Sequence, residues 1–121
     1  MNRLTLYAHP KCTTCKMARD WLRRQGVAFT EKDIRTTPPS VAELRAVLQA
    51  SDGKLSRISN TSGMEYRAQG LAAKLPALTE EAALGLLGRN GMFVKRPFLV
   101  GPGVALAGFK EPTWAEAFGL K

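Results

Sequence analysis

The sequence lacks long apolar runs, and its 121 residues include only two cysteines and one histidine. No apolar segment approaches the roughly 18–20 residues that a membrane-spanning helix needs, so no membrane association is expected. The opening stretch, MNRLTLYAHP, has no apolar core followed by a cleavage site and therefore predicts no signal peptide. Together these absences predict a cytoplasmic globular protein, and the 45% hydrophobic content is typical of one.

Acidic residues are also few: 10 Asp and Glu stand against 18 Lys and Arg, which gives a net charge of +8. Such an excess suits an acidic partner, such as nucleic acid, an anionic substrate or an acidic protein surface, but it also arises on an ordinary solvated surface. The basic residues are scattered and no block of five or more like charges occurs, so direct binding to nucleic acid is not expected.

The two cysteines, Cys12 and Cys15, both lie in the segment HPKCTTCKMARDW. A disulfide between them would close a very short loop and so constrain the unfolded chain little, and cytoplasmic thiols are kept reduced. A structural zinc site needs four ligands, whereas His9 is the only further imidazole or thiol donor, so no metal is expected. The alternatives to a redox pair are a zinc site completed by a carboxylate or another chain, and a pair of inert buried cysteines.

Apolar periodicity predicts strands at residues 4–7 and 27–34. Residues 13–25 between them are expected to form a helix that is capped by Thr13 or Thr14. A strand–helix–strand succession with short links implies a parallel pair joined by a right-handed crossover. The buried stripe of this helix is predicted to consist of Met17, Ala18, Trp21 and Leu22.

The rest of the chain is predicted to form a helical block followed by a hairpin. Ser40 and Glu43 make a capping box that opens a helix. A short helix is expected near residues 63–69, and another begins at Thr79. Residues 96–109 are expected to form a hairpin around a Gly-Pro-Gly turn, and a closing helix follows it.

Taken in order, these elements predict a single α/β domain over residues 1–121. Its sheet is expected to have about four strands, with both parallel and antiparallel pairs. The helical block, over about residues 38–92, is inserted between the second and third strands.

Cys12 stands at the junction of the first predicted strand and the first predicted helix. Unpaired N–H groups and the helix dipole stabilise an anion there, and Lys11 adds positive charge, which predicts a Cys12 pKa well below the usual value of about 8.5. The thiolate is the nucleophilic form, and Cys15 follows one turn later, where it can resolve a mixed disulfide on Cys12. Lys11, Thr13 and Thr14 flank the attacking sulfur and are predicted to contact the substrate.

A family resemblance rests on three separated segments, YAHPKCTTCKMARDWLRRQGV, DIRTTPPSVAEL and KRPFLVGPGVALAGFKEPTW. Together they resemble the arsenate-reductase-like branch of the thioredoxin superfamily, which includes arsenate reductases, Spx-type regulators and small reductases. The resemblance implies a thioredoxin-like fold. It also implies that Cys12 is the nucleophile, that Arg96 points toward it, and that Pro97 is a cis proline that holds a thiol substrate.

The chain departs at three places from the arsenate reductases that it resembles. The resemblance implies serine where this chain has Cys15, and two further arginines that hold the oxyanion. Asn60 stands where one of them would fall, although Arg57 is near, and the segment GPGVALAG contains no arginine. Holding arsenate takes several charge-assisted donors, so the departures disfavour arsenate reduction, and Asn60 is predicted to contact a different substrate.

The resemblance therefore implies a thiol–disulfide oxidoreductase that acts on a small thiol or a protein disulfide. It implies no bound cofactor, with glutathione, thioredoxin or glutaredoxin as the reductant. The alternative is an Spx-like redox-switched regulator that binds RNA polymerase.

Overall fold

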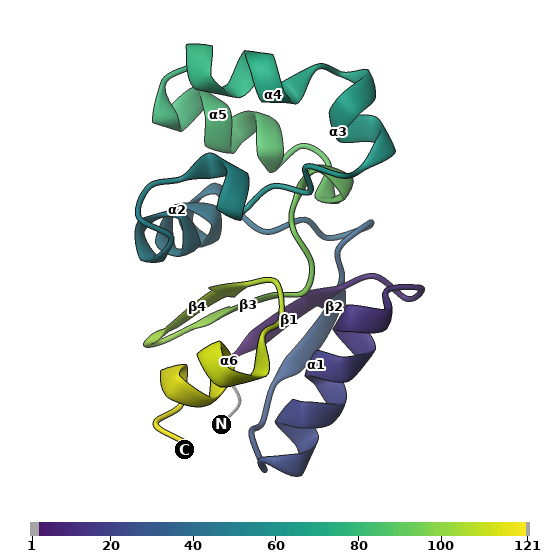
Figure 1. Ribbon diagram of the computed structural model, residues 1–121, viewed down its shortest axis with the longest axis vertical. Helices are drawn as coiled ribbons and strands as arrows, with labels where there is room; N and C mark the ends of the chain where they lie inside the picture. The colour runs from purple at the N-terminus through teal and green to yellow at the C-terminus, as the bar shows by residue number, and fades with distance from the viewer. Residues whose placement is uncertain (1–2, 121) are drawn as a thin grey trace.

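The fold is built on a four-stranded mixed sheet, and the computed structural model describes residues 3–120 (Figure 1). The strands are β1 (Thr5–Ala8), β2 (Thr30–Asp33), β3 (Phe98–Gly101) and β4 (Val104–Ala107), in the order β2-β1-β3-β4. β1 pairs with β2 in parallel and with β3 antiparallel, and β3 pairs with β4 antiparallel. The predicted mixed α/β sheet is therefore confirmed.

Six α-helices surround the sheet within the part of the chain that the structure describes. They are α1 (Thr13–Arg24), α2 (Val41–Ala50), α3 (Met64–Ala68), α4 (Leu71–Lys74), α5 (Glu80–Leu87) and α6 (Glu111–Ala117). Three short 3₁₀ helices, η1 (Leu55–Arg57), η2 (Leu75–Ala77) and η3 (Gly91–Phe93), link them. Figure 1 shows α1 and α6 on one side of the sheet, with α2 to α5 stacked on the other. The inserted helical block thus has a face of the sheet to itself.

The strand side chains alternate between two hydrophobic cores, as the two-residue period of a strand requires. Leu6 and Leu99 pack with α1 and α6, whereas Tyr7 and Phe98 pack with the inserted helices. Each fully buried side chain of this size stabilises the fold by about 1.5–3 kcal/mol. The two central strands, β1 and β3, therefore contribute side chains to both cores and connect the inserted helices on one face to α1 and α6 on the other.

Two local predictions for α1 are wrong. Cys12, rather than Thr13 or Thr14, is the N-cap residue, because its sulfur accepts the hydrogen bond that a threonine hydroxyl was expected to accept. Met17 is 54% exposed, while Cys15 is fully buried beside Ala18, Trp21 and Leu22. The buried side chains of α1 lie on an arc centred near Ala18 and Leu22. Successive residues of a helix are about 100° apart, and this spacing places Met17 outside the arc.

The capping box that opens α2 is confirmed and connects this helix to the sheet. The Ser40 hydroxyl accepts from the Glu43 backbone N–H at 3.1 Å, and the Glu43 carboxylate accepts from the Ser40 N–H at 2.9 Å. The same carboxylate oxygen accepts from the Tyr7 hydroxyl at 2.7 Å. A local helix-start signal therefore also fixes α2 against β1.

Candidate active site

The site begins where β1 ends, in the loop from His9 to Lys11 that leads into α1. The carbonyl of His9 accepts from the Cys12 backbone N–H at 3.1 Å, and its ring Nδ1 accepts from the Lys11 N–H at 3.0 Å. These two bonds turn the chain from strand to helix. His9 therefore shapes the loop that presents Cys12.

Cys12 is half-buried, and its Sγ accepts the backbone N–H of Cys15 at 3.1 Å. This N–H belongs to the first turn of α1, whose donors have no partner within the helix. The first turn also contains no acidic residue. A negative sulfur at this position would meet a donated N–H and the positive end of the helix dipole.

Cys15 differs sharply from Cys12 because it is fully buried. Burial first, and then the hydrogen bond with the Cys12 side chain, raise the pKa of the Cys15 thiol to about 12. Both cysteines are free thiols in the structure. The pair therefore combines a half-buried thiol with a fully buried, protonated neighbour.

This asymmetry predicts selective alkylation. Because thiolate is the reactive form, a pKa of about 12 leaves Cys15 almost wholly unreactive at pH 8, and its reactivity rises about tenfold per pH unit until it ionises. We expect iodoacetamide to label Cys12 and to spare Cys15 at pH 8, as measured by peptide mass spectrometry. The same reaction in denaturant is the control and should label both cysteines. Equal labelling of the two in the native protein would contradict the assignment.

Arg96 and Pro97 reach the same end of the sheet from β3. The bond between them is cis, as the resemblance implied, and Pro97 is buried just before the strand that pairs with β1. The positive charge of Arg96 acts on Cys15, where it favours the thiolate and partly opposes the effect of burial. Desolvation lowers the pKa of His9, and the positive charge of Arg96 lowers it further.

The Arg96 guanidinium has a neutral partner that the sequence did not indicate. Its Nη1 donates to the sulfur of Met92 at 3.5 Å, and within residues 3–120 it forms no salt bridge. A thioether is a weak acceptor that carries no charge. The contact therefore orients Arg96 and leaves its positive charge available to a ligand. No sequence pattern marks a methionine in an irregular segment for this role.

Asn60, which was also predicted to contact the substrate, forms hydrogen bonds with η3. Its side-chain Nδ2 donates to the Met92 carbonyl at 3.2 Å, and its backbone N–H donates to the Phe93 carbonyl at 2.8 Å. These bonds join the segment after η1 to η3. Asn60 is thus connected to Arg96 through Met92, and it does not line the cleft described next; its contact with a substrate stays a prediction.

A cleft of about 620 Å³ opens beside the cysteine loop. Of the residues predicted for the site, Thr14 and Arg96 line it, while Lys11 and Thr13 are exposed next to Cys12. The rest of the lining comes from the end of α2, η1, the segment before β3, β4, the segment after β4, and α6, and consists of Ala50, Ser51, Arg57, Lys95, Ala105, Leu106, Ala107, Gly108, Phe109, Lys110, Thr113 and Trp114. Sequence reasoning did not find this cleft, because no local pattern joins residues from four distant elements.

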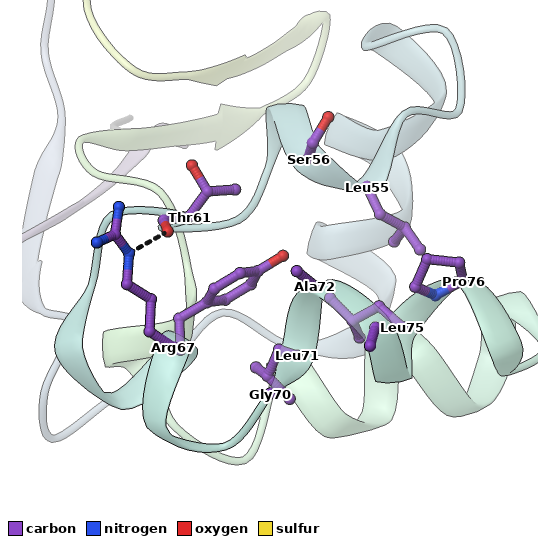
Figure 2. A pocket seen from close by; sticks show the side chains of 11 residues that line it. Leu55, Ser56, Thr61, Arg67, Gly70, Leu71, Ala72, Leu75 and Pro76 are labelled. Atoms are coloured by element: carbon purple, nitrogen blue, oxygen red, sulfur yellow. Dashed lines mark hydrogen bonds between the residues drawn. The ribbon is translucent and has the colours of Figure 1, made fainter.

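A second cavity, of about 500 Å³, lies within the helical block. Figure 2 shows its mostly apolar lining, with Leu55, Leu71, Leu75 and Pro76 around it and the Arg67 Nε donating to the Thr61 carbonyl at 3.4 Å. None of the residues predicted for the redox site lines this cavity. It is therefore separate from the cysteine pair.

Among the residues that the structure describes, no group of three or more His, Cys, Asp and Glu side chains could hold a metal ion. No helix over the same range is long and apolar enough to cross a membrane. The side chains at the site itself include two thiols, a guanidinium and neighbouring lysines.

Comparison with known proteins gives a consistent result. Residues 7–117 match the model of the ArsC family. The chain is 41% identical over 113 residues to the uncharacterized protein YusI of Bacillus subtilis strain 168, covering 93% of this chain and 96% of that protein. It is 32% identical over 108 residues to the global transcriptional regulator Spx of Enterococcus faecalis, covering 89% of this chain and 80% of Spx. The crystal structure of a possible arsenate reductase from Streptococcus mutans UA159 is similar with a TM-score of 0.82 and 38% identity, covering 91% of this chain and 93% of that one.

Proposed function

Because the chain belongs to the ArsC family, we propose that it is a thiol–disulfide oxidoreductase that uses Cys12 to attack and Cys15 to resolve. One observation carries the proposal: Cys12 is only half-buried at the start of α1, while its partner Cys15 is fully buried one turn behind it. A nucleophile must meet its substrate, and a resolving thiol needs only to meet the nucleophile. The burial of the two cysteines matches that division of roles.

In the first step, the Cys12 thiolate attacks one sulfur of a substrate disulfide. A mixed disulfide forms between Cys12 and that sulfur, the substrate S–S bond breaks, and the other substrate sulfur leaves as a thiolate that takes a proton from solvent. The N–H of Cys15 stabilises the attacking anion before the step. The positive charge of Arg96 lies at the same end of the sheet and stabilises negative charge around the pair.

In the second step, Cys15 gives up its proton and attacks the Cys12 sulfur. The Cys12–Cys15 disulfide forms and the second substrate thiolate leaves with the proton, so the two protein thiols supply both electrons. The high pKa of Cys15 keeps it protonated in the resting, reduced pair. Two glutathione molecules, or one thioredoxin or glutaredoxin dithiol, then reduce the protein disulfide and complete the cycle.

The neighbouring residues have supporting roles in this proposal. Lys11, Thr13 and Thr14 are exposed around Cys12, where an ammonium and two hydroxyls can contact the substrate. Pro97 is buried next to Arg96 at the start of β3, and its backbone carbonyl accepts from the Gly108 N–H at 2.7 Å. That bond keeps the proline loop in place against β4.

Trapping with oxidised glutathione tests the assignment of the two roles. We expect the Cys15→Ser variant to accumulate a stable glutathione adduct on Cys12, because nothing resolves it. The parent should instead form the internal disulfide, and Cys12→Ser should form no adduct. Intact and peptide mass spectrometry distinguish these products. An adduct on Cys15, or none on either cysteine, would refute the proposed function.

A second candidate function is redox-dependent regulation of transcription, which the similarity to Spx favours. In that case the Cys12–Cys15 pair would act as a switch, and the chain would bind RNA polymerase in one redox state. Pull-down with purified RNA polymerase, using oxidised and reduced protein, tests this. Absence of binding in both states excludes it.

A further inference from the structure

We propose that the cleft along β4 binds an extended, acidic polypeptide segment as an added strand, so that the substrate is a disulfide in a protein. This rests on the proposed function, because it names the substrate class of the same redox site. Four observations support it: a free strand edge, a cleft that follows the edge, unneutralised cations around the cleft, and the direction in which the strand runs.

The free edge belongs to β4, which is the last strand of the sheet order β2-β1-β3-β4. The Gly108 N–H donates to the Pro97 carbonyl at 2.7 Å, and the antiparallel register pairs Leu99 with Leu106. Backbone groups in such a pair alternate between the two sides of the strand, so those of Ala105 and Ala107 face away from β3. No strand within residues 3–120 pairs with that side.

The cleft follows this edge. Ala105, Ala107 and Gly108 all line it, between the end of α2 on one side and α6 on the other. Ala105 and Ala107 have small side chains, so another backbone can approach closely there, while the Lys95 side chain lies against Gly108. Figure 1 shows β4 at the margin of the sheet next to α2 and α6. An exposed edge with unpaired N–H and C=O groups is the surface to which extended peptides add as a strand.

Charge defines the chemistry of the partner. No acidic residue lines the cleft, whereas Arg57, Lys95, Arg96 and Lys110 do. Arg57 is paired with Asp52 at 3.2 Å, but among the described residues the other three form no salt bridge. Charges that the protein leaves unneutralised favour a complementary partner, which here is a segment rich in Asp or Glu.

The direction of β4 connects the cleft to the cysteines. β1 and β4 are both antiparallel to β3, so their carboxyl ends lie at the same end of the sheet. Cys12 follows the carboxyl end of β1, and Thr14, two residues later, lines the cleft. A strand added to β4 therefore reaches the same end of the sheet as Cys12, three strand positions from β1, and Thr14 and Arg96 line the part of the cleft between them. Its disulfide would take the two electrons of the Cys12–Cys15 pair in the two steps given above.

Peptide binding tests the proposal without the redox chemistry. We use the double variant Cys12→Ser, Cys15→Ser and a fluorescein-labelled octapeptide of alternating Glu and Val, and measure fluorescence anisotropy. We expect binding at least about tenfold tighter than that of the matching Lys and Val peptide, since each 1.4 kcal/mol is a factor of ten. We also expect the Glu and Val peptide to lose about tenfold in affinity when alternate backbone nitrogens are methylated, because strand addition needs their N–H groups.

Two charge variants locate the site. Lys110→Glu should weaken binding of the acidic peptide by about tenfold, whereas the matched control Lys74→Glu, outside the cleft on α4, should leave it unchanged. Equal loss in both variants would show only a general charge effect and would overturn the proposal. Equal binding of the methylated and unmethylated peptides, or no peptide binding at all, would also overturn it. Glutathione trapping on Cys12 without peptide binding would refute this proposal and leave the proposed function standing.

Discussion

Cys12→Ser is expected to lower kcat/KM for disulfide reduction by about 10³-fold or more, which is the usual scale for removing a nucleophile. The loss should be chemical rather than structural, because serine is a favoured N-cap residue and its hydroxyl can accept the Cys15 N–H that the sulfur accepts now. The free energy of unfolding should therefore stay within about 1 kcal/mol of the parent value. Reduction of a chromogenic aromatic disulfide by a defined thiol donor measures the activity, and urea unfolding measures the stability.

Cys15→Ser is the matched control for this experiment. It keeps the nucleophile, so the first attack should proceed at nearly the parent rate in a single turnover, followed by a stalled mixed disulfide. The combination of a lost first step in one variant and a kept first step in the other identifies attacker and resolver. Retention of more than a tenth of the parent kcat/KM by Cys12→Ser would remove Cys12 from the mechanism.

Gly91→Ala is expected to lower the free energy of unfolding by more than about 4 kcal/mol, a size that marks a specific structural conflict. A Cβ on Gly91 would overlap the carbonyl oxygen of Ile34 and lie 2.7 Å from its carbonyl carbon. That backbone cannot easily move aside, because Ile34 is fully buried and its N–H donates to the Ala8 carbonyl at 3.0 Å. The substitution therefore forces η3 away from the end of β2.

Gly85→Ala is the control, and it is expected to raise the free energy of unfolding rather than lower it. Gly85 lies inside α5, where a Cβ would meet nothing within 4 Å. Alanine is favoured over glycine in a helix by about 0.5–1 kcal/mol, so this variant should be slightly more stable than the parent. Urea unfolding followed by circular dichroism compares the two variants. A Gly91→Ala protein within 1 kcal/mol of the parent would mean that the close approach to Ile34 is easily relieved.

The Gly91 contact also matters for the site. Gly91 begins η3, and Met92 in the same turn accepts from both Asn60 and Arg96. Displacing η3 would therefore shift the support of the Arg96 guanidinium. We expect any folded fraction of Gly91→Ala to show slower disulfide reduction than the parent, even though Gly91 lies outside the segment that contains both cysteines.

Local signals allowed much of the fold to be predicted. The capping box at Ser40 and Glu43, and the helix start at Thr79, depend on contacts three residues apart, and the structure confirms both. The hairpin around the Gly-Pro-Gly turn is confirmed for the same reason, because a turn is decided by its own few residues. The mixed sheet then followed from the order of the elements.

The cap of α1 shows where such reasoning fails. Thr13, Thr14 and Cys12 all carry a side-chain acceptor near the helix start, and sequence statistics favour a hydroxyl over a thiol. The chain instead turns one residue earlier, because the His9 carbonyl accepts the Cys12 N–H and fixes Cys12 in the cap position. The buried face of α1 includes Cys15 and excludes Met17 for a different reason, because packing against the sheet and α6 decides which side of the helix is covered.

By itself, the sequence determined the order of the strands and of the longer helices, and the presence of a cysteine pair at the first strand–helix junction, because these follow from patterns of residues close together in the chain; α4 and the 3₁₀ helices were not predicted. Only the tertiary structure decided which cysteine is buried, which neutral side chain holds Arg96, and how the edge of β4 meets α2 and α6 to form a basic cleft. The physical reason is distance along the chain. Burial and charge at the site arise from side chains that come together only when the sheet and the inserted helices pack.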